Sequence, residues 1–355
     1  MNASTLYDVI SGVVNQTSLD IRLRRVLRDF VLGVLVSKSC LLDDVAHSLT
    51  PLGSRDSQYR RLQRFLANER VDGRQLQGEW AHIVMTFLKP NSLVLLVDET
   101  ALSQHLKIMV LGMWMPGGCV PIAWRSYVPS AYPACGQVGL IIDLLDRVRP
   151  AFPLPLSVVL LADRGIGTSP DLIRAVDGRG IDLLFRVQGS CRFRYPDGRV
   201  VSLSQQGGVP GRIWQAAGTV FKKAGWLPLV ATVAHAQAYD EAWHLVSTRP
   251  LDPTLYGLRF DQEVGFRDLK SDGFQWHSSH VWLPDHADRL LLVLAMTYWL
   301  VLVVGHSLPP IHTGRQARLS TFRRGLDILR DGFRPTIAIL LPPPVPPPRI
   351  TCVVQ

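Results

Sequence analysis

The first part of the chain carries apolar residues at helical spacing. Residues 17–39 (TSLDIRLRRVLRDFVLGVLVSKS) begin at a Ser18 or Asp20 cap and repeat apolar positions every three or four residues, which predicts an α-helix. The segments 40–49 (CLLDDVAHSL) and 58–71 (QYRRLQRFLANERV) predict a short second helix and a third helix. We therefore expect this part of the chain to be helical.

The third of these helices is amphipathic and basic. Arg60, Arg61 and Arg64 accompany an apolar set of side chains on it. A helix, a short helix, a turn and a basic amphipathic helix form the outline of a helix-turn-helix DNA reader, which predicts that the three arginines contact DNA. A solvated surface helix has the same pattern, so that alternative stays open.

From about residue 91 the pattern changes to strands and helices. Two continuous apolar runs of strand length each end in an aspartate, Asp98 in SLVLLVDET and Asp163 in PLSVVLLADRG. The predicted elements are, in order, a strand at 92–100, a hairpin at 104–128, a helix at 135–149, a strand at 155–165, a helix at 169–180 and a strand at 181–189. This is the order of the ribonuclease-H-like α/β fold, an antiparallel three-strand meander extended by parallel strands. We expect a fold of that class.

A segment of short β-like pieces, separated by glycines and charged turns, follows at residues 190–249. After it come a helix at 256–270, an apolar helix and a basic helix at 318–330. We expect four parts: a helical DNA-binding region at 1–88, a ribonuclease-H-like core at 89–189 and 250–335, a β-rich insertion at 190–249 and a proline-rich tail at 336–355.

The composition narrows the class of partner. The chain has 355 residues, of which 47% are hydrophobic, enough for a large folded core. Its net charge of +9 favours a polyanionic partner, either nucleic acid or an anionic membrane surface. The five cysteines are scattered and form no CxxC pair, so they predict free thiols in a reducing cytoplasm and no zinc site.

One apolar segment imitates a membrane span. Leu290–Val304 (LLLVLAMTYWLVLVV) is shorter than the ~20 residues needed to cross a bilayer, and a buried core helix is the better interpretation. The first residues (MNASTLYDVISG) lack a basic segment followed by an apolar one, so no signal peptide is predicted. We expect a protein of the cytoplasm that does not enter a membrane.

Three acidic residues form a candidate metal site. A carboxylate next to an apolar run is costly unless something pairs with it. Asp98 and Asp163 end strands that the predicted fold places side by side, and Glu263 on the later helix would join them. Three hard oxygen donors suit Mg²⁺ or Mn²⁺, and two such ions about 3.5–4 Å apart can clamp the oxygens of a phosphoryl displacement. Taken singly, Asp98 also fits a strand-end turn or a helix cap, and Asp163 an ion pair with Arg164.

The helix that carries Glu263 adds cations around it. On an α-helix of roughly 100° per residue, the stripe about 80° wide that contains Glu263 also contains Tyr256, Arg259, Arg267 and Lys270. One carboxylate thus lies among three cations and a phenol, which fits a face that holds a metal ion and phosphates. A solvated charged face has the same pattern, so the stripe alone does not choose between them.

These motifs resemble those of DDE transposases of the insertion sequence 4 family. Tyr256, two residues, Arg259, three residues, Glu263, six residues and Lys270 match that family's tyrosine-arginine-glutamate-lysine signature. The segments VDET and LLADRGIG resemble the blocks around the family's first and second catalytic acids. A β-rich insertion before the third acid is also a feature of that family, and the resemblance covers roughly residues 20–335.

The resemblance implies a metal-dependent DNA transposase. Asp98, Asp163 and Glu263 would be the catalytic acids and would bind two Mg²⁺ (or Mn²⁺) ions. Water would free a 3′-hydroxyl at the transposon end, and that hydroxyl would attack the opposite strand or target DNA. The partners would be the terminal inverted repeats and the target DNA, bound by a homodimer in a prokaryotic cytoplasm.

The same resemblance assigns phosphate contacts near the cleaved end to Tyr256, Arg259 and Lys270. Arginine and lysine neutralise phosphate and tyrosine donates one hydrogen bond, so the chemistry fits. Arg267 shares the stripe, and we expect it to touch DNA as well.

Other functions stay open. A non-catalytic regulator that binds transposon ends, such as a decayed copy, would keep the DNA contacts without the chemistry. Another nuclease of the same fold would cut without joining. Trp226 and Trp243 in the insertion could each stack on a flipped base, or could be ordinary core or surface aromatics.

Overall fold

The structure is a computed structural model that describes residues 3–153, 155–207, 210–235, 241–308 and 319–330. The helices are α1 (Ala3–Val14), α2 (Ile21–Ser37), α3 (Leu42–Ser48), α4 (Arg55–Ala67), α5 (Gly73–Leu88), α6 (Gly136–Val148), α7 (Arg164–Gly167), α8 (Pro170–Asp177), α9 (Phe260–Arg267), α10 (Pro284–Ser307) and α11 (Thr321–Arg330). The strands are β1 (Ser92–Ala101), β2 (Lys107–Met115), β3 (Gly118–Tyr127), β4 (Ser157–Ala162), β5 (Asp182–Arg186), β6 (Arg192–Arg194), β7 (Val200–Ser202), β8 (Ile213–Val220), β9 (Leu227–Ala234) and β10 (Trp243–Ser247).

The strands form one mixed sheet in the order β3-β2-β1-β4-β5-β10-β9-β8-β6-β7. β1, β2 and β3 make an antiparallel meander, and β4 and β5 add to it parallel to β1. The expected α/β class and the expected meander with parallel additions are both confirmed. The strands expected at 190–249 are also present, and they continue the same sheet because β10 pairs antiparallel with β5.

The two faces of the sheet carry two hydrophobic clusters. Alternate residues of a strand point to opposite faces, so Leu95 and Val97 join the large cluster under the helices, whereas Val94 and Leu96 join a smaller one. The smaller cluster is closed by apolar residues of the segment before α9, including Tyr256. The sheet is thus covered on both faces near the carboxyl ends of β1 and β4.

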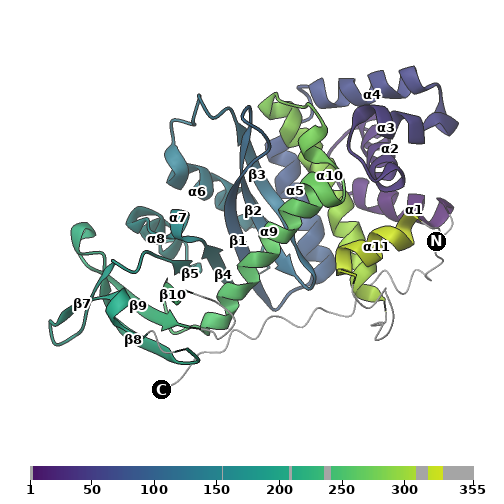
Figure 1. Ribbon diagram of the computed structural model, residues 1–355. Coiled ribbons are helices and arrows are strands. Elements are labelled where there is room, and N and C mark those ends of the chain that lie inside the picture. Colours follow the sequence, from purple (N-terminus) through teal and green to yellow (C-terminus); the bar gives the residue numbers. More distant parts are fainter. Residues whose placement is uncertain (1–2, 154, 208–209, 236–240, 309–318, 331–355) are drawn as a thin grey trace.

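Helices gather at one end of the sheet and the late strands at the other. Figure 1 shows α1–α4 and α11 at one side and β7–β9 at the opposite side, with α10 next to the N-terminal helices. Helix α10 is long and apolar enough to span a membrane, yet 89% of its most apolar window is buried inside the protein. It is therefore a core helix, as the sequence predicts.

Local capping signals are confirmed where the sequence shows them. The Asp20 side chain accepts hydrogen bonds from the backbone N–H groups of Arg22 and Leu23 at the start of α2. Ser169 caps α8, with Pro170 at the first helical position. Helices α1 and α5 lie within the region 1–88 that we expected to be helical, although no separate helix was predicted for either segment. The proline-rich tail at 336–355 lies outside the described residues.

The expectation of one α-helix over 256–270 is wrong. The chain forms a 3₁₀ helix at Pro253–Arg259, then α9, then a turn of π-helix at Asp268–Asp272. Tight 3₁₀ turns are frequent at helix starts, and here Pro253 follows the capping residue Asp252. In a 3₁₀ turn residues three apart eclipse each other, and the Arg259 guanidinium lies 5.8 Å from the centre of the Tyr256 ring. Tyr256 itself is buried in the smaller cluster.

Candidate functional site

Asp98 and Asp163 lie side by side at one edge of the sheet. β1 and β4 pair in parallel with Val97 opposite Ala162, so the next residue on each chain is an aspartate. Neighbouring strands are about 4.8 Å apart. The register of the two strands therefore brings the two acids together, as the sequence predicts.

The two aspartates also share a face. Leu96 and Leu161 belong to the smaller cluster, and side chains two residues further along a strand point to the same side. Asp98 and Asp163 thus continue the face on which the 253–267 segment lies. Glu99 points to the opposite face, where it accepts hydrogen bonds from Lys107 and from the Tyr127 hydroxyl.

The Asp98 carboxyl carries the strongest electrostatic signature of the site. Its burial and the nearby negative charge of Asp163 raise the pKa of Asp98 to about 6, although Arg259 acts in the opposite direction. Glu263 adds a further repulsion to the same carboxyl. Asp98 is therefore close enough to both other candidate acids to be influenced by their charges.

Asp163 has a structural role as well. Its Oδ1 accepts a hydrogen bond from the Ile166 N–H at 3.0 Å and so caps the short helix α7. Arg164, the alternative partner considered for Asp163, instead lies 4.0 Å from Glu241. One carboxylate oxygen of Asp163 remains available for another partner.

Glu263 is exposed on α9 and is held by Arg259. The guanidinium donates from Nη2 to Glu263 Oε1 at 2.6 Å, while its Nη1 lies 3.9 Å from Asp98 Oδ2. The Arg259 side chain is only 9% exposed, against 52% for Glu263. A nearly buried cation thus bridges the first and third candidate acids.

The other residues of the expected stripe differ in their surroundings. Tyr256 is fully buried against Trp243, at a ring distance of 5.1 Å, and burial raises the pKa of its hydroxyl. Lys270 is half-buried and donates to the Thr100 hydroxyl, and burial lowers its pKa. Arg267 is exposed and pairs with Asp272 at 3.2 Å.

Two residues of the site were not predicted. Arg186 ends β5, and because Phe185 lies opposite Ala162, it stands beside Asp163 on the same face. Arg186 follows the apolar run of β5, just as Asp98 and Asp163 follow the apolar runs of β1 and β4. This charge after an apolar run is visible in the sequence. Gln262 is buried and donates to the carbonyls of Leu96 and Val110 at 3.4 and 3.3 Å, which anchors α9 on the sheet.

The fit of a divalent cation can be judged from the acids themselves. The donors suit it in kind, since the charge of Asp163 helps to raise the pKa of the adjacent Asp98, and a cation relieves such repulsion. The arrangement is open, because Arg259 holds Glu263. Within the described residues no group of three or more His, Cys, Asp or Glu side chains is placed closely enough to hold a metal ion. Asp98 and Asp163 could hold one, with Glu263 completing the set after it leaves Arg259.

The three arginines of α4 differ in their surroundings. Arg60 and Arg64 are exposed. Arg61 forms an ion pair with the buried Asp29, its Nη2 lying 2.8 Å from Asp29 Oδ2. Arg61 therefore ties α4 to α2, whereas the other two are free to meet a ligand.

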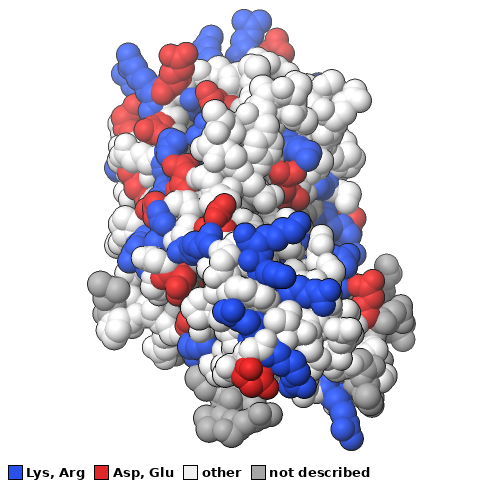
Figure 2. All heavy atoms as spheres, turned by 90° about the vertical axis from the view of Figure 1, so that its left-hand side faces the viewer, with Lys and Arg blue, Asp and Glu red and all other residues white. Residues whose placement is uncertain are grey.

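The late strands carry a strong excess of positive charge. Residues 192–235 contain one acid, Asp197, and six basic residues: Arg192, Arg194, Arg199, Arg212, Lys222 and Lys223. Figure 2, which views the molecule from the side of these strands, shows Lys and Arg gathered over the middle and lower part of this face. This surface suits a polyanion.

The two tryptophans of the insertion have different settings. Trp243 is 7% exposed and packs on Tyr256, so it is a core residue. Trp226 is half-buried and lies under the Arg194 guanidinium, 4.6 Å from its ring centre. Of the cysteines, Cys40, Cys119, Cys135 and Cys191 are free thiols, as the sequence predicts.

Comparison with known proteins adds no relative. No protein-family model matches the chain, and a search of curated proteins finds no significant match.

Proposed function

We propose that the protein is a DNA transposase built on a ribonuclease-H-like core, with Asp98, Asp163 and Glu263 as its catalytic acids. The observation that carries this proposal is the register of β1 and β4, which sets Asp98 beside Asp163 on the face that α9 covers. The strand order and directions of β1–β5 support the choice of core.

The acids would hold two Mg²⁺ or Mn²⁺ ions. When bound, such ions activate the attacking oxygen and stabilise the leaving oxygen of a phosphoryl transfer. The chain itself contributes a rigid platform: Asp98 is fixed on the sheet, Asp163 by its cap, and α9 by Gln262. The fixed positions of the two aspartates cost little reorganisation, whereas Glu263 has to leave Arg259 before it can join them.

The cations around the acids would bind the DNA. Arg186 and Arg259 lie next to the acids, and Arg259 would exchange Glu263 for a phosphate when DNA enters. Lys270 would contact the DNA strand beyond these two arginines. A contact from Tyr256 requires its hydroxyl to leave the smaller cluster, and one from Arg267 would lie further along the DNA.

Recognition of the transposon ends would fall to other parts of the chain. Arg60 and Arg64 on α4 suit the terminal inverted repeats, and the basic face of the late strands suits flanking or target DNA. Joining two ends requires at least a dimer on DNA. The charge of +9 favours DNA, which is a polyanion, and the burial of α10 fits a protein that acts outside a membrane. A prokaryotic cytoplasm as its location rests on the resemblance alone.

The test is cleavage of a labelled duplex that carries the element's own end. We expect Mg²⁺-dependent nicking by the wild type, its loss in Glu263→Gln and its retention in Asp177→Asn, which alters an exposed acid on α8. Joining of the freed 3′-hydroxyl to a second duplex distinguishes a transposase from a simple nuclease. A wild type that binds the end but cuts it with neither Mg²⁺ nor Mn²⁺ would instead be a non-catalytic end-binding regulator.

A further inference from the structure

A pocket lined by three arginines lies outside the edge strand β3. It encloses about 450 Å³ between the carboxyl end of β3, the start of α5, the last turn of α6 and the start of α10. Arg74, Arg125 and Arg147 come from three of these elements. None of the acids or cations assigned to the catalytic site lines this pocket.

Arg147 is the most firmly held of the three. Its side chain is only 7% exposed, its Nη2 lies 2.5 Å from Asp143 Oδ2, and its Nη1 donates to the Gln77 side chain and the Trp124 carbonyl. Its Nε is buried and has no hydrogen-bond partner among the described residues. A guanidinium fixed in this way is oriented before any ligand arrives.

The three guanidinium groups of the pocket differ in their ion pairs. Asp143 pairs with both Arg74 and Arg147, so one carboxylate serves two guanidinium groups. Arg125 is half-buried on β3 and forms no ion pair with the described residues. A bidentate anion such as a phosphate matches the fork of a guanidinium.

The opposite wall offers hydrogen-bond acceptors. Asp285 and Asp288 line it from the first turn of α10, and Asp288 Oδ1 accepts from the Ser126 N–H at 2.9 Å. Burial raises the pKa of Asp288 to about 7, which reduces its negative charge near neutral pH. A ligand with an anionic end and a hydroxyl or amino donor at the other end fits both walls.

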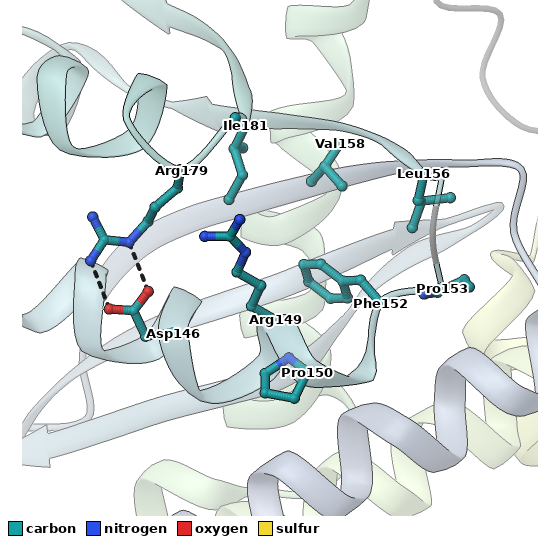
Figure 3. Close-up of a pocket in the computed structure, with 10 residues that line it drawn as sticks. Asp146, Arg149, Pro150, Phe152, Pro153, Leu156, Val158, Arg179 and Ile181 are labelled. Carbon is teal, nitrogen blue, oxygen red and sulfur yellow. Dashed lines mark hydrogen bonds and ion pairs between the residues drawn. The ribbon is translucent and has the colours of Figure 1, made fainter.

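A second cavity of similar size lacks these features. It encloses about 420 Å³ at the amino ends of β4 and β5 (Figure 3). There Asp146 and Arg179 close a two-point ion pair at 2.7 Å, and the remaining cation, Arg149, is exposed beside Phe152 and two prolines. It therefore has no buried, oriented cation to select an anion.

We propose that the three-arginine pocket binds a phosphorylated nucleoside unit, with the phosphate on Arg74, Arg125 and Arg147 and the sugar or base on the acidic wall. The unit belongs either to a DNA strand or to a free nucleotide. The first source rests on the proposed function. Trp124, which precedes Arg125, is in register with Val110 and through it with Asp98, so this position of β3 lies about two strand spacings, ~10 Å, from Asp98 across the sheet. Arg125, in register with Met109 and through it with Glu99, points to the opposite face of the sheet.

The test uses the full chain with two probes, deoxyadenosine monophosphate by calorimetry and a labelled short duplex by fluorescence anisotropy at several salt concentrations. We expect Arg125→Ala to weaken at least one probe about tenfold or more, and Arg125→Lys to weaken it less. For the duplex, the slope of log affinity against log salt should fall by about 1. Arg22→Ala, an exposed arginine on α2, is the matched control, and thermal unfolding checks that each variant folds.

Each outcome decides the proposal. A loss confined to the nucleotide assigns the site to a free ligand, and a loss with the duplex assigns it to the DNA backbone. If Arg125→Ala binds both probes like the wild type and Arg22→Ala, or if the wild type binds neither probe, the pocket is not a phosphate site. Because these are binding measurements, a wild type that never cuts DNA would overturn the transposase proposal and leave this one standing.

Discussion

The Arg259 guanidinium lies between two candidate acids, with its Nη2 2.6 Å from Glu263 Oε1 and its Nη1 3.9 Å from Asp98 Oδ2. A nearly buried arginine thus supplies the positive charge that offsets these carboxylates in the protein alone. A metal ion that binds Glu263 would have to displace the Arg259 guanidinium, and a DNA phosphate would have to draw that guanidinium away from Glu263. The state of the site is therefore set by competition for Glu263.

We predict that Arg259→Ala raises the affinity for Mn²⁺ while it lowers the affinity for the transposon end. Removing the guanidinium frees Glu263 and takes away a cation that repels the metal, which should strengthen Mn²⁺ binding by about 5- to 10-fold. Titration of Mn²⁺ by electron paramagnetic resonance measures the first effect. Arg267→Ala, which removes an exposed arginine of the same helix paired with Asp272, should leave Mn²⁺ binding unchanged. Equal Mn²⁺ affinities in wild type and Arg259→Ala would contradict this competition.

Substitutions of Asp163 should separate its two roles. Asp163→Asn keeps an oxygen that can accept from the Ile166 N–H, so stability should stay near that of the wild type. Asp163→Ala removes the cap and should cost about 1 kcal/mol. Both should lower cleavage about a hundredfold or more, because losing a charged metal ligand costs several kcal/mol of transition-state stabilisation. Urea unfolding and end cleavage, measured on the same samples, test this, and a fully active Asp163→Asn would remove Asp163 from the catalytic set.

The arginines of α4 should divide into one structural and two DNA-binding residues. Arg61→Ala should cost roughly 1 kcal/mol of stability, since Asp29 is buried and, among the described residues, would keep only its ion pair with Arg28 at 3.0 Å. Arg60→Ala and Arg64→Ala should unfold like the wild type but weaken duplex binding. Each should lower the slope of log affinity against log salt concentration by about 1. If both exposed variants bind the duplex as tightly as the wild type, α4 is an ordinary surface helix.

Asp268 should make stability depend on pH. It is 6% exposed, and its burial raises the pKa of this carboxyl to about 7, above the usual value near 3.9 in an unfolded chain. A raised pKa means that the contribution of Asp268 is fully present below about pH 4 and is lost as the pH rises through about 7. The advantage of Asp268→Asn over wild type should therefore grow with pH, by roughly 1.4 kcal/mol for each unit between the two pKa values.

Urea unfolding between about pH 5 and about pH 8 measures that difference. Asp177→Asn, at an exposed acid, serves as the control and should follow the wild type at every pH. A constant difference between Asp268→Asn and wild type across this range would show that Asp268 does not titrate there.

The local sequence determined much of the secondary structure and part of the site. The apolar runs before Asp98 and Asp163 form β1 and β4 because a strand buried on both faces needs apolar side chains at every position. Asp20 and Ser169 cap their helices because a short oxygen-bearing side chain can satisfy free N–H groups at a helix start. Each of these features depends only on residues close in the chain, so a periodic pattern is enough to find it.

Tertiary structure decided which of the charged residues meet. Strand pairing across about sixty residues of sequence put Asp98 beside Asp163 and then added Arg186, which no local pattern marks as their neighbour. The 253–272 segment packs into both hydrophobic clusters and forms three kinds of helix in place of one. This packing buries Tyr256 and leaves Glu263 exposed and paired with Arg259. The periodicity of one helix cannot reveal such an outcome, because burial against distant strands sets the energy of each side chain and overrides the local rule.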